Sequence, residues 1–158
     1  MPTPVVADRA SAADVEQLFD LQIALFREDA GVHDRNTDLT WPEREGRNDF
    51  ERLLPDEGSL VMAARDGASV VGFLVGYLAP SSPTRRPVTY AVLRSLYVSP
   101  SHRGTEAARQ LVDEFLAWAR DRGCAEAHVD CYAANDHARR FYERQGFAPH
   151  SIQHVREL

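Results

Sequence analysis

Cysteine is scarce in this sequence, and its apolar runs are short. Only two of the 158 residues are cysteines, Cys124 and Cys131. They lack the C-x-x-C spacing of zinc or redox pairs, and two cysteines do not make the disulfide scaffold of a secreted protein, so we expect reduced thiols. The longest apolar run, residues 70–79, is interrupted by Gly72 and Gly76 and is too short to cross a bilayer. The six histidines show neither H-x-x-x-H nor H-E-x-x-H spacing, so no metal site is predicted.

Basic residues are also fewer than acidic residues in this sequence. Lys and Arg number 18 against 24 Asp and Glu, which gives a formal net charge of −6. That balance argues against broad binding of nucleic acid through its phosphates and suits a basic acceptor. Asp8, Arg9 and Asp14 interrupt the first apolar residues, so we expect no signal peptide and a cytoplasmic location. With 44% hydrophobic residues, the length predicts one globular domain over residues 1–158.

Residue periodicity and turn residues predict an α/β protein with a mixed, mostly antiparallel sheet and helices on both faces. The Asp66-Gly67 pair predicts a hairpin turn, and Gly31 is expected to end the first helix. Strands are expected at residues 5–7, 59–64, 69–78, 88–98 and 125–132, with one or two more over 147–158. Helices are expected at residues 15–26, from Pro42 to Leu54, from Ala107 to the turn at Gly123, and from Asn135 to Gly146.

One junction between a strand and a helix, residues 96–108, carries a specific signal. Pro100 ends the strand, and apolar residues recur at helical spacing from Ala107. The free N–H groups of the first helical turn, with the helix dipole, favour a phosphate or pyrophosphate there. Arg103 would be a charged partner, and Gly104 would let a ligand approach the main chain. From this segment alone, an ordinary solvated turn is an equal alternative.

A second segment, residues 135–147, makes the interpretation more specific. It reads N-D-H-A-R-R-F-Y-E-R-Q-G-F and resembles the N-x-x-A-x-x-F/L-Y-x-x-x-G-F segment of the GCN5-related N-acetyltransferase (GNAT) superfamily. The junction resembles the same family's R/Q-x-x-G-x-G/A pyrophosphate loop. With their flanking elements the two motifs span residues 91–147, and the order of the earlier elements also fits. The resemblance implies the GNAT fold, in which a splayed cleft of the sheet holds the cofactor.

The family resemblance also implies an activity. It is the transfer of an acetyl or other acyl group from acetyl-CoA to a primary amine of a small molecule or peptide, by direct attack in a ternary complex. Coenzyme A is then a co-substrate, and no metal is needed. The main chain of Leu96, Tyr97 and Val98 would hold the pantetheine arm, and the N–H of Tyr97 or Val98 would polarise the thioester carbonyl. The pyrophosphate would be held by the amides of Arg103, Gly104, Thr105, Glu106, Ala107 and Ala108.

Two residues of the second segment take roles by the same resemblance. Asn135 would contact the pantetheine or sulfur region, although asparagine is also a preferred helix N-cap. Tyr142 would be the catalytic residue beside the sulfur. Its phenol is protonated at neutral pH and can give its proton to the leaving thiolate or hydrogen-bond it. The alternative is that Tyr142 is a core aromatic residue.

The sequence departs from the family pattern at two positions. Glu106 stands where the loop usually has glycine, so its carboxylate must turn away from the pyrophosphate. Arg94 stands near the position where many relatives carry an acidic base. The proton of the acceptor ammonium must therefore go elsewhere. The candidates, each of which is also an ordinary surface residue, are Glu28, Asp29, His33 and Asp130.

These departures keep two other functions open. One is a non-catalytic sensor that binds acyl-CoA, and the other is an unrelated protein that binds nucleotide phosphates at a helix terminus. The acceptor amine is not specified by the sequence, and a homodimer, frequent among relatives, is left open as well.

Overall fold

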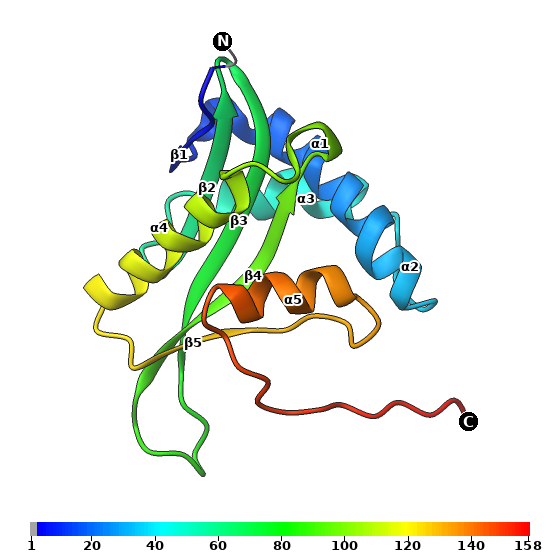
Figure 1. Cartoon of the computed structure of the whole chain (residues 1–158), viewed down its shortest axis with the longest axis vertical. Helices are drawn as coiled ribbons and strands as arrows, with labels where there is room; N and C mark the ends of the chain where they lie inside the picture. Colours follow the sequence, from blue (N-terminus) through cyan, green and yellow to red (C-terminus); the bar gives the residue numbers. More distant parts are fainter. Residues whose placement is uncertain (1–2) are drawn as a thin grey trace.

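The computed structural model describes residues 3–158, and its centre is a five-stranded sheet in the order β1-β2-β3-β4-β5 (Figure 1). The first three pairs of neighbouring strands are antiparallel, and β4 and β5 are parallel. The predicted mixed, mostly antiparallel sheet is therefore confirmed. The strands are β1 (Val6–Arg9), β2 (Ser59–Asp66), β3 (Ser69–Pro80), β4 (Thr89–Val98) and β5 (Glu126–Val129).

Helices cover both faces of this sheet, as predicted. Helices α1 (Val15–Leu25) and α3 (Trp41–Leu53) pack on one face, and α4 (Ala107–Asp121) and α5 (Asp136–Arg144) pack on the other. Side chains of β2 alternate between the two cores: Leu60 and Met62 lie on the α4 side, and Val61 and Ala63 lie on the side of α1 and α3. This period of two is the pattern of a strand that is buried on both faces.

The turn residues act largely as expected. Gly67 has φ +60° in the hairpin between β2 and β3, and Gly123 has φ +73° directly after α4. A side chain at either position would strain the backbone. Asn135 caps α5, because its Oδ1 accepts a hydrogen bond from the N–H of Ala138 at 3.1 Å.

The prediction that Gly31 ends the first helix is wrong. After α1 the chain makes a π-helical turn, Phe26–Ala30, and continues as α2 (Gly31–His33). Gly31 has φ −63°, an ordinary helical value. A Cβ at this position would lie 2.9 Å from the carbonyl oxygen of Phe26 and 3.0 Å from the side chain of Leu39. Glycine is therefore needed here for close packing rather than for a left-handed turn.

The prediction of strands over residues 147–158 is also wrong. This segment has no regular secondary structure and runs away from α5 to the C-terminus (Figure 1). Phe147 packs on Tyr142, but the large apolar residues beyond it, Ile152, Val155 and Leu158, are three positions apart and are 78% or more exposed. A strand needs apolar residues two positions apart to bury one face, so the segment has no buried side to pair with the sheet.

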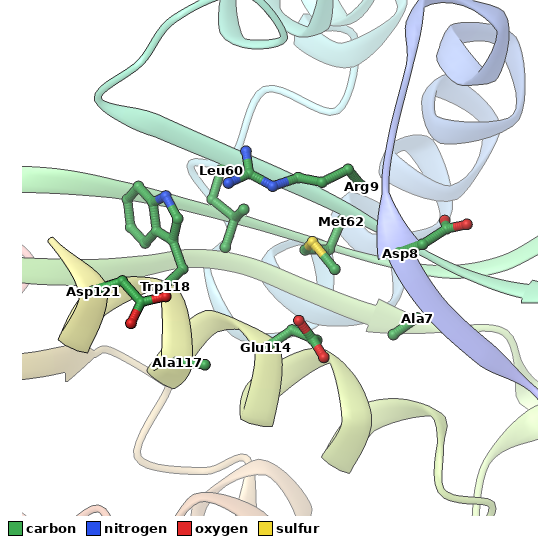
Figure 2. A pocket seen from close by; sticks show the side chains of 9 residues that line it. All are labelled: Ala7, Asp8, Arg9, Leu60, Met62, Glu114, Ala117, Trp118 and Asp121. Atoms are coloured by element: carbon green, nitrogen blue, oxygen red, sulfur yellow. The ribbon is translucent and has the colours of Figure 1, made fainter.

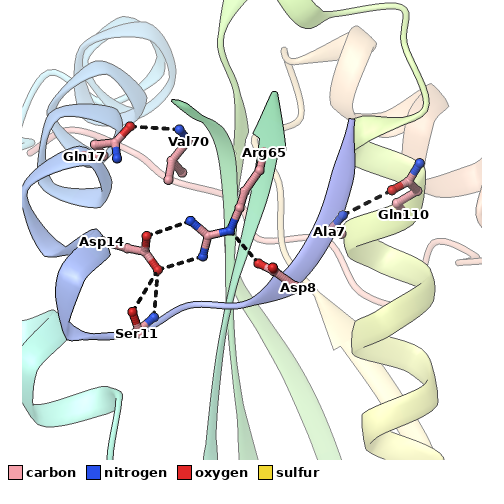
Figure 3. Close-up of polar contacts among 8 residues, drawn as sticks. All are labelled: Ala7, Asp8, Ser11, Asp14, Gln17, Arg65, Val70 and Gln110. Atoms are coloured by element: carbon pink, nitrogen blue, oxygen red, sulfur yellow. Dashed lines mark hydrogen bonds and ion pairs between the residues drawn. The ribbon is translucent and has the colours of Figure 1, made fainter. Parts of the chain in front are cut away.

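Polar contacts fix the first helix against the sheet (Figure 3). Arg65 of β2 donates to Asp14 at 2.7 and 2.8 Å and to Asp8 of β1 at 2.7 Å. The guanidinium holds the pKa of the buried Asp14 carboxyl below its usual range. Gln17 of α1 accepts from the N–H of Val70 at 2.8 Å. These contacts fix where α1 begins, and hence where its far end lies above β4.

Candidate functional site

The last two strands of the sheet separate along their length. Pairing between β4 and β5 stops at Leu93 and Val129, although β4 continues to Val98. A β-bulge lies at this point, because Val75 of β3 pairs with Ser95 and the next residue pairs with Leu93. Arg94 is the extra residue. We call the opening between the two strands beyond this bulge the splay.

The register decides which main-chain groups of β4 face the splay. The N–H of Ser99 donates to the carbonyl oxygen of Val71 at 2.8 Å, so these residues form a hydrogen-bonded antiparallel pair. Because such pairs alternate along antiparallel strands, the main chain of Tyr97 pairs with Phe73. The N–H and C=O groups of Leu96 and Val98 then point toward the splay. Only these two of the three expected arm-binding residues offer their main chain to an added ligand.

The loop between β4 and α4 presents its main chain to solvent. Residues 103–106 are exposed, whereas Ala107 at the start of α4 is fully buried. Gly104 has φ +77°, a value that the loop reaches without strain only with glycine. The hydroxyl of Thr105 accepts from the N–H of Ala107 at 3.3 Å. The expected pyrophosphate-binding segment therefore lies at the N-terminus of a 15-residue helix that follows the splay edge.

Glu106 does not extend across this loop. Its carboxylate forms an ion pair with Arg109, one turn further along α4, and Arg109 also contacts Asp113 at 3.2 Å. The backbone of Glu106 is helical, with φ −74°, so replacing the family's usual glycine strains nothing here. The Glu106 carboxylate is directed along α4 toward Arg109 and away from the loop amides. It shares the guanidinium of Arg109 with Asp113.

Arg103 lies at the border of the splay. Its Nε donates to the carbonyl oxygen of Val98 at 2.9 Å, and its Nη2 donates to Glu28 at 3.1 Å. Its guanidinium carbon is 5.4 Å from the centre of the Tyr97 ring. Burial and the nearby Glu28 carboxylate raise the pKa of Tyr97 to about 12. Arg103 of the loop thus contacts both β4 and the π-helical turn.

Tyr142 lies on α5 and Asn135 is the N-cap of that helix, which follows the chain segment after β5. Asn135 Nδ2 donates to Asp29 Oδ1 at 3.0 Å. Tyr142 packs against Phe141 and Phe147 and contacts the core beneath α5. Burial raises the pKa of the Tyr142 phenol well above its usual range, and the nearby Cys131 and Asp29 act in the same direction. Tyr142 is therefore a neutral hydrogen-bond donor at physiological pH.

The π-helical turn was not foreseen from the sequence, although two of its residues were. In this turn, Glu28 accepts a hydrogen bond from Arg103, and the adjacent Asp29 accepts one from Asn135. The turn therefore contacts both the loop after β4 and the N-terminus of α5. A π-helical turn adds one residue to a helical turn, which a 3.6-residue pattern does not reveal. Asp130 follows β5 and is near Cys131, but no contact joins it to the expected ligand-binding residues described here.

Arg94, the residue at the bulge, is used in a structural ion pair. Its Nη2 is 2.6 Å from Asp49 of α3, whose side chain is only 8% exposed. Burial by itself would raise the pKa of Asp49, but Arg94 and Arg52 together lower it. Asp49 is thus a paired carboxylate and no free base. A shallow hollow of about 550 Å³ beside this pair is lined by Trp41, Arg44, Glu45, Asn48, Asp49 and Arg52.

A second hollow, of about 350 Å³, lies between β1 and α4 (Figure 2). Trp118, Met62 and Leu60 form its apolar side, and none of the expected site residues line it. Over residues 3–158 there is no cluster of three side chains that could hold a metal ion, and no helix is long and apolar enough to cross a membrane. None of the expected site residues therefore lines either hollow.

Comparison with known proteins agrees with this geometry. Residues 16–147 match the model of the family described as acetyltransferase (GNAT) family. An uncharacterized N-acetyltransferase of Mycobacterium bovis is 33% identical over 98 residues, which are 62% of this chain. The chain spans only 58% of the length of that relative.

Two further similarities concern proteins with named substrates. The aminoglycoside N(6')-acetyltransferase type 1 of Acinetobacter genomosp. 13 is 28% identical over 115 residues, covering 69% of this chain and 77% of that protein. The structure of AAC(6')-Iy in complex with a CoA-containing bisubstrate analogue has a TM-score of 0.76 and 16% identity, and 99% of each chain is covered. The shared fold therefore includes a protein that accommodates a CoA moiety.

Proposed function

We propose, since the chain belongs to the GNAT acetyltransferase family, that it transfers an acetyl group from acetyl-CoA to a primary amine in a ternary complex. Residues 1–158 would act as one catalytic domain in the cytoplasm, without a metal ion. The observation that carries the proposal is the splay, which ends at an exposed helix N-terminus. A free strand edge beside an anion-binding helix end suits an extended arm that carries a pyrophosphate.

The chemistry of the residues at the splay fits coenzyme A. Leu96 and Val98 direct their main chain into the splay, where no strand pairs with them, although the carbonyl oxygen of Val98 accepts from Arg103. The amides of residues 103–108 would hold the pyrophosphate, with no carboxylate between them because Glu106 is bound to Arg109. The N–H of Val98 would polarise the thioester carbonyl, since the N–H of Tyr97 is directed to β3. Removing such an oxyanion donor costs other enzymes about 10²–10³ in rate.

Tyr142 would act on the leaving sulfur. Because burial raises the pKa of its phenol, proton transfer from Tyr142 to a thiolate is unfavourable. We therefore assign Tyr142 a hydrogen bond to the developing thiolate rather than full loss of its proton. Asn135 would contact the pantetheine near the sulfur with the part of its amide that neither caps α5 nor binds Asp29.

The acceptor would be a small amine that is cationic before it reacts. The net charge of −6 favours such a substrate, and Glu28 and Asp29 border the splay on the side where an acceptor would enter. The named relatives act on aminoglycosides, which carry several amines. A peptide amine is the second candidate, because one structural neighbour is a ribosomal-protein-alanine N-acetyltransferase from Brucella.

The test is release of free CoA thiol from acetyl-CoA across a panel of aminoglycosides, polyamines, amino acids and short peptides. We expect thiol release with one amine class and none without an amine. Calorimetric titration with CoA, ATP and NAD complements it. Binding of CoA without turnover on any amine would indicate the sensor instead. Binding of ATP but not CoA would reject both and favour the nucleotide-binding alternative.

A further inference from the structure

His33 lies close to the π-helical turn Phe26–Ala30, which contacts Arg103 and Asn135. His33 is in α2, and its Nε2 is 3.9 Å from Asp29 Oδ1. Its ring stacks on Tyr132, with ring centres 5.3 Å apart and planes 29° apart. The His33 side chain is only 18% exposed. The imidazole is therefore held on one side by an aromatic ring and on another by a carboxylate.

Asp29 connects His33 to the residues expected at the sulfur. The same oxygen that faces His33 accepts the hydrogen bond from Asn135. The carboxylate is also close enough to raise the pKa of Tyr142 and Cys131. An amine that attacks the thioester beside Tyr142 would thus approach from the side where Asp29 and His33 lie.

We propose that His33 is the catalytic base that takes the proton from the acceptor ammonium, and that Asp29 is the residue that positions it. This assignment rests on the proposed function. Nε2 of His33 faces Asp29 at 3.9 Å, an electrostatic contact that is too long for a hydrogen bond. With the proton of neutral His33 on Nε2, Nδ1 keeps its lone pair and can accept a proton. The carboxylate then orients the imidazole by its charge.

The other acidic candidates suit this role less well. Glu28 is already bound to Arg103. An imidazole is a stronger base than a carboxylate and is the side chain that enzymes use most often to move a proton. The titratable groups that contact His33 are Asp29 and Tyr132, and Asp34 lies near Tyr132. Burial raises the pKa of Tyr132, so this ring stays neutral and Asp29 is the charged group in contact with the imidazole.

The proton balance is complete. The ammonium gives one proton to Nδ1 of His33, and the resulting amine forms a C–N bond with the thioester carbon. The C–S bond then breaks, and the sulfur leaves as a thiolate hydrogen-bonded to Tyr142. The nitrogen loses a second proton, which ends on the sulfur, and His33 releases the first proton to solvent. The products are the amide, free CoA and one proton.

The test is the pH dependence of kcat and kcat/KM for the wild type, H33Q and D29N, with H154Q as matched control. His154 lies in the exposed C-terminal segment. We expect H33Q to lower kcat by about 10²–10⁴-fold, to lose the fall of kcat at acid pH, and to bind CoA as the wild type does. D29N should lower kcat less and keep that fall at acid pH, because it removes only the residue that positions the imidazole. H154Q should behave as the wild type does.

Two further readouts keep the assignment falsifiable. In H33A, added imidazole should restore part of kcat, which a variant with a merely structural defect would not show. A wild-type acid limb and near-wild-type kcat in H33Q, with normal turnover by the wild type, would overturn the role of His33 alone. Failure of the wild type to acetylate any amine would overturn the proposed function, and the base assignment with it.

Discussion

Gly76 is the residue at which the splay can be perturbed from a distance. It lies in β3 opposite Leu93, directly beside the bulge. A Cβ at Gly76 would lie 2.7 and 2.8 Å from two ring atoms of Phe115 and 3.3 Å from the carbonyl oxygen of Val92. Ordinary carbon contacts are about 3.5–4.0 Å, so in G76A the ring must move by about 1 Å. Phe115 is fully buried in α4, so the helix has to move with it.

The expected cost follows from this overlap. Overpacking of a filled core costs about 1–3 kcal/mol, and in a protein of this size each kcal/mol lowers Tm by about 2–4 °C. Movement of α4 also shifts the amides at its N-terminus relative to β4. Loss of one such hydrogen bond, worth about 1 kcal/mol, corresponds to roughly fivefold weaker CoA binding. Thermal unfolding and calorimetric titration with CoA measure the two effects.

Two variants serve as controls for G76A. G67A strains the hairpin at φ +60° with nothing within 4 Å of the new Cβ, so it should lower Tm without changing CoA affinity. F115L removes Cε2, the ring atom nearest the new Cβ, so the double variant G76A/F115L should recover part of both quantities relative to G76A. The reasoning is refuted if G76A binds CoA as tightly as G67A does, or if F115L fails to restore either quantity.

Three further predictions concern single contacts. Y142F should lower kcat by about 10–100-fold with CoA affinity within about twofold, measured by single-turnover thiol release, and equal losses in kcat and affinity would contradict its assignment to the sulfur. R109A should weaken CoA binding about two- to fivefold at low salt, because the Glu106 carboxylate loses its partner, and E106Q/R109A should reverse this in calorimetry. The lowered pKa of Asp49 means that its pairing stabilises the fold above the unfolded pKa of about 3.9 and is lost as pH falls through the folded pKa. Urea unfolding should therefore show a steeper loss below about pH 4 in the wild type than in D49N, and parallel curves would count against the Arg94–Asp49 pair.

Much of the fold could be predicted because its elements have strong periodic patterns. The apolar stripe of α4 and the alternation of β2 each serve one buried face, so their sequence determines their type. Gly67, Gly123 and Asn135 were identified because turn and cap chemistry is local. Gly31 and residues 147–158 were misassigned because tertiary contacts decide their structure. Gly31 is required by the approach of Leu39, and the large apolar residues after Phe147 are exposed.

The candidate site was harder to predict than the fold, because it depends on two irregular places in the main chain. The bulge at Arg94 and the π-helical turn Phe26–Ala30 each insert one residue into a regular element. The bulge lies where pairing between β4 and β5 ends, and it directs Arg94 to Asp49. The π-helical turn brings Glu28 and Asp29 to the opposite side of the same opening.

Neither irregularity follows from residue periodicity, since one extra residue leaves the hydrophobic pattern of a short segment almost unchanged. The motif residues could therefore be found from the sequence, and Glu28 and Asp29 could be listed as candidates, but their pairing with Arg103 and Asn135 could not be predicted. The family motifs indicate only the residues expected to bind the cofactor. The structure adds the side chains that contact those residues, Glu28 at Arg103 and Asp29 at Asn135. In the proposed reaction the acceptor reaches the thioester past those side chains, so acceptor preference and pH dependence should respond to substitution of Glu28, Asp29 and His33.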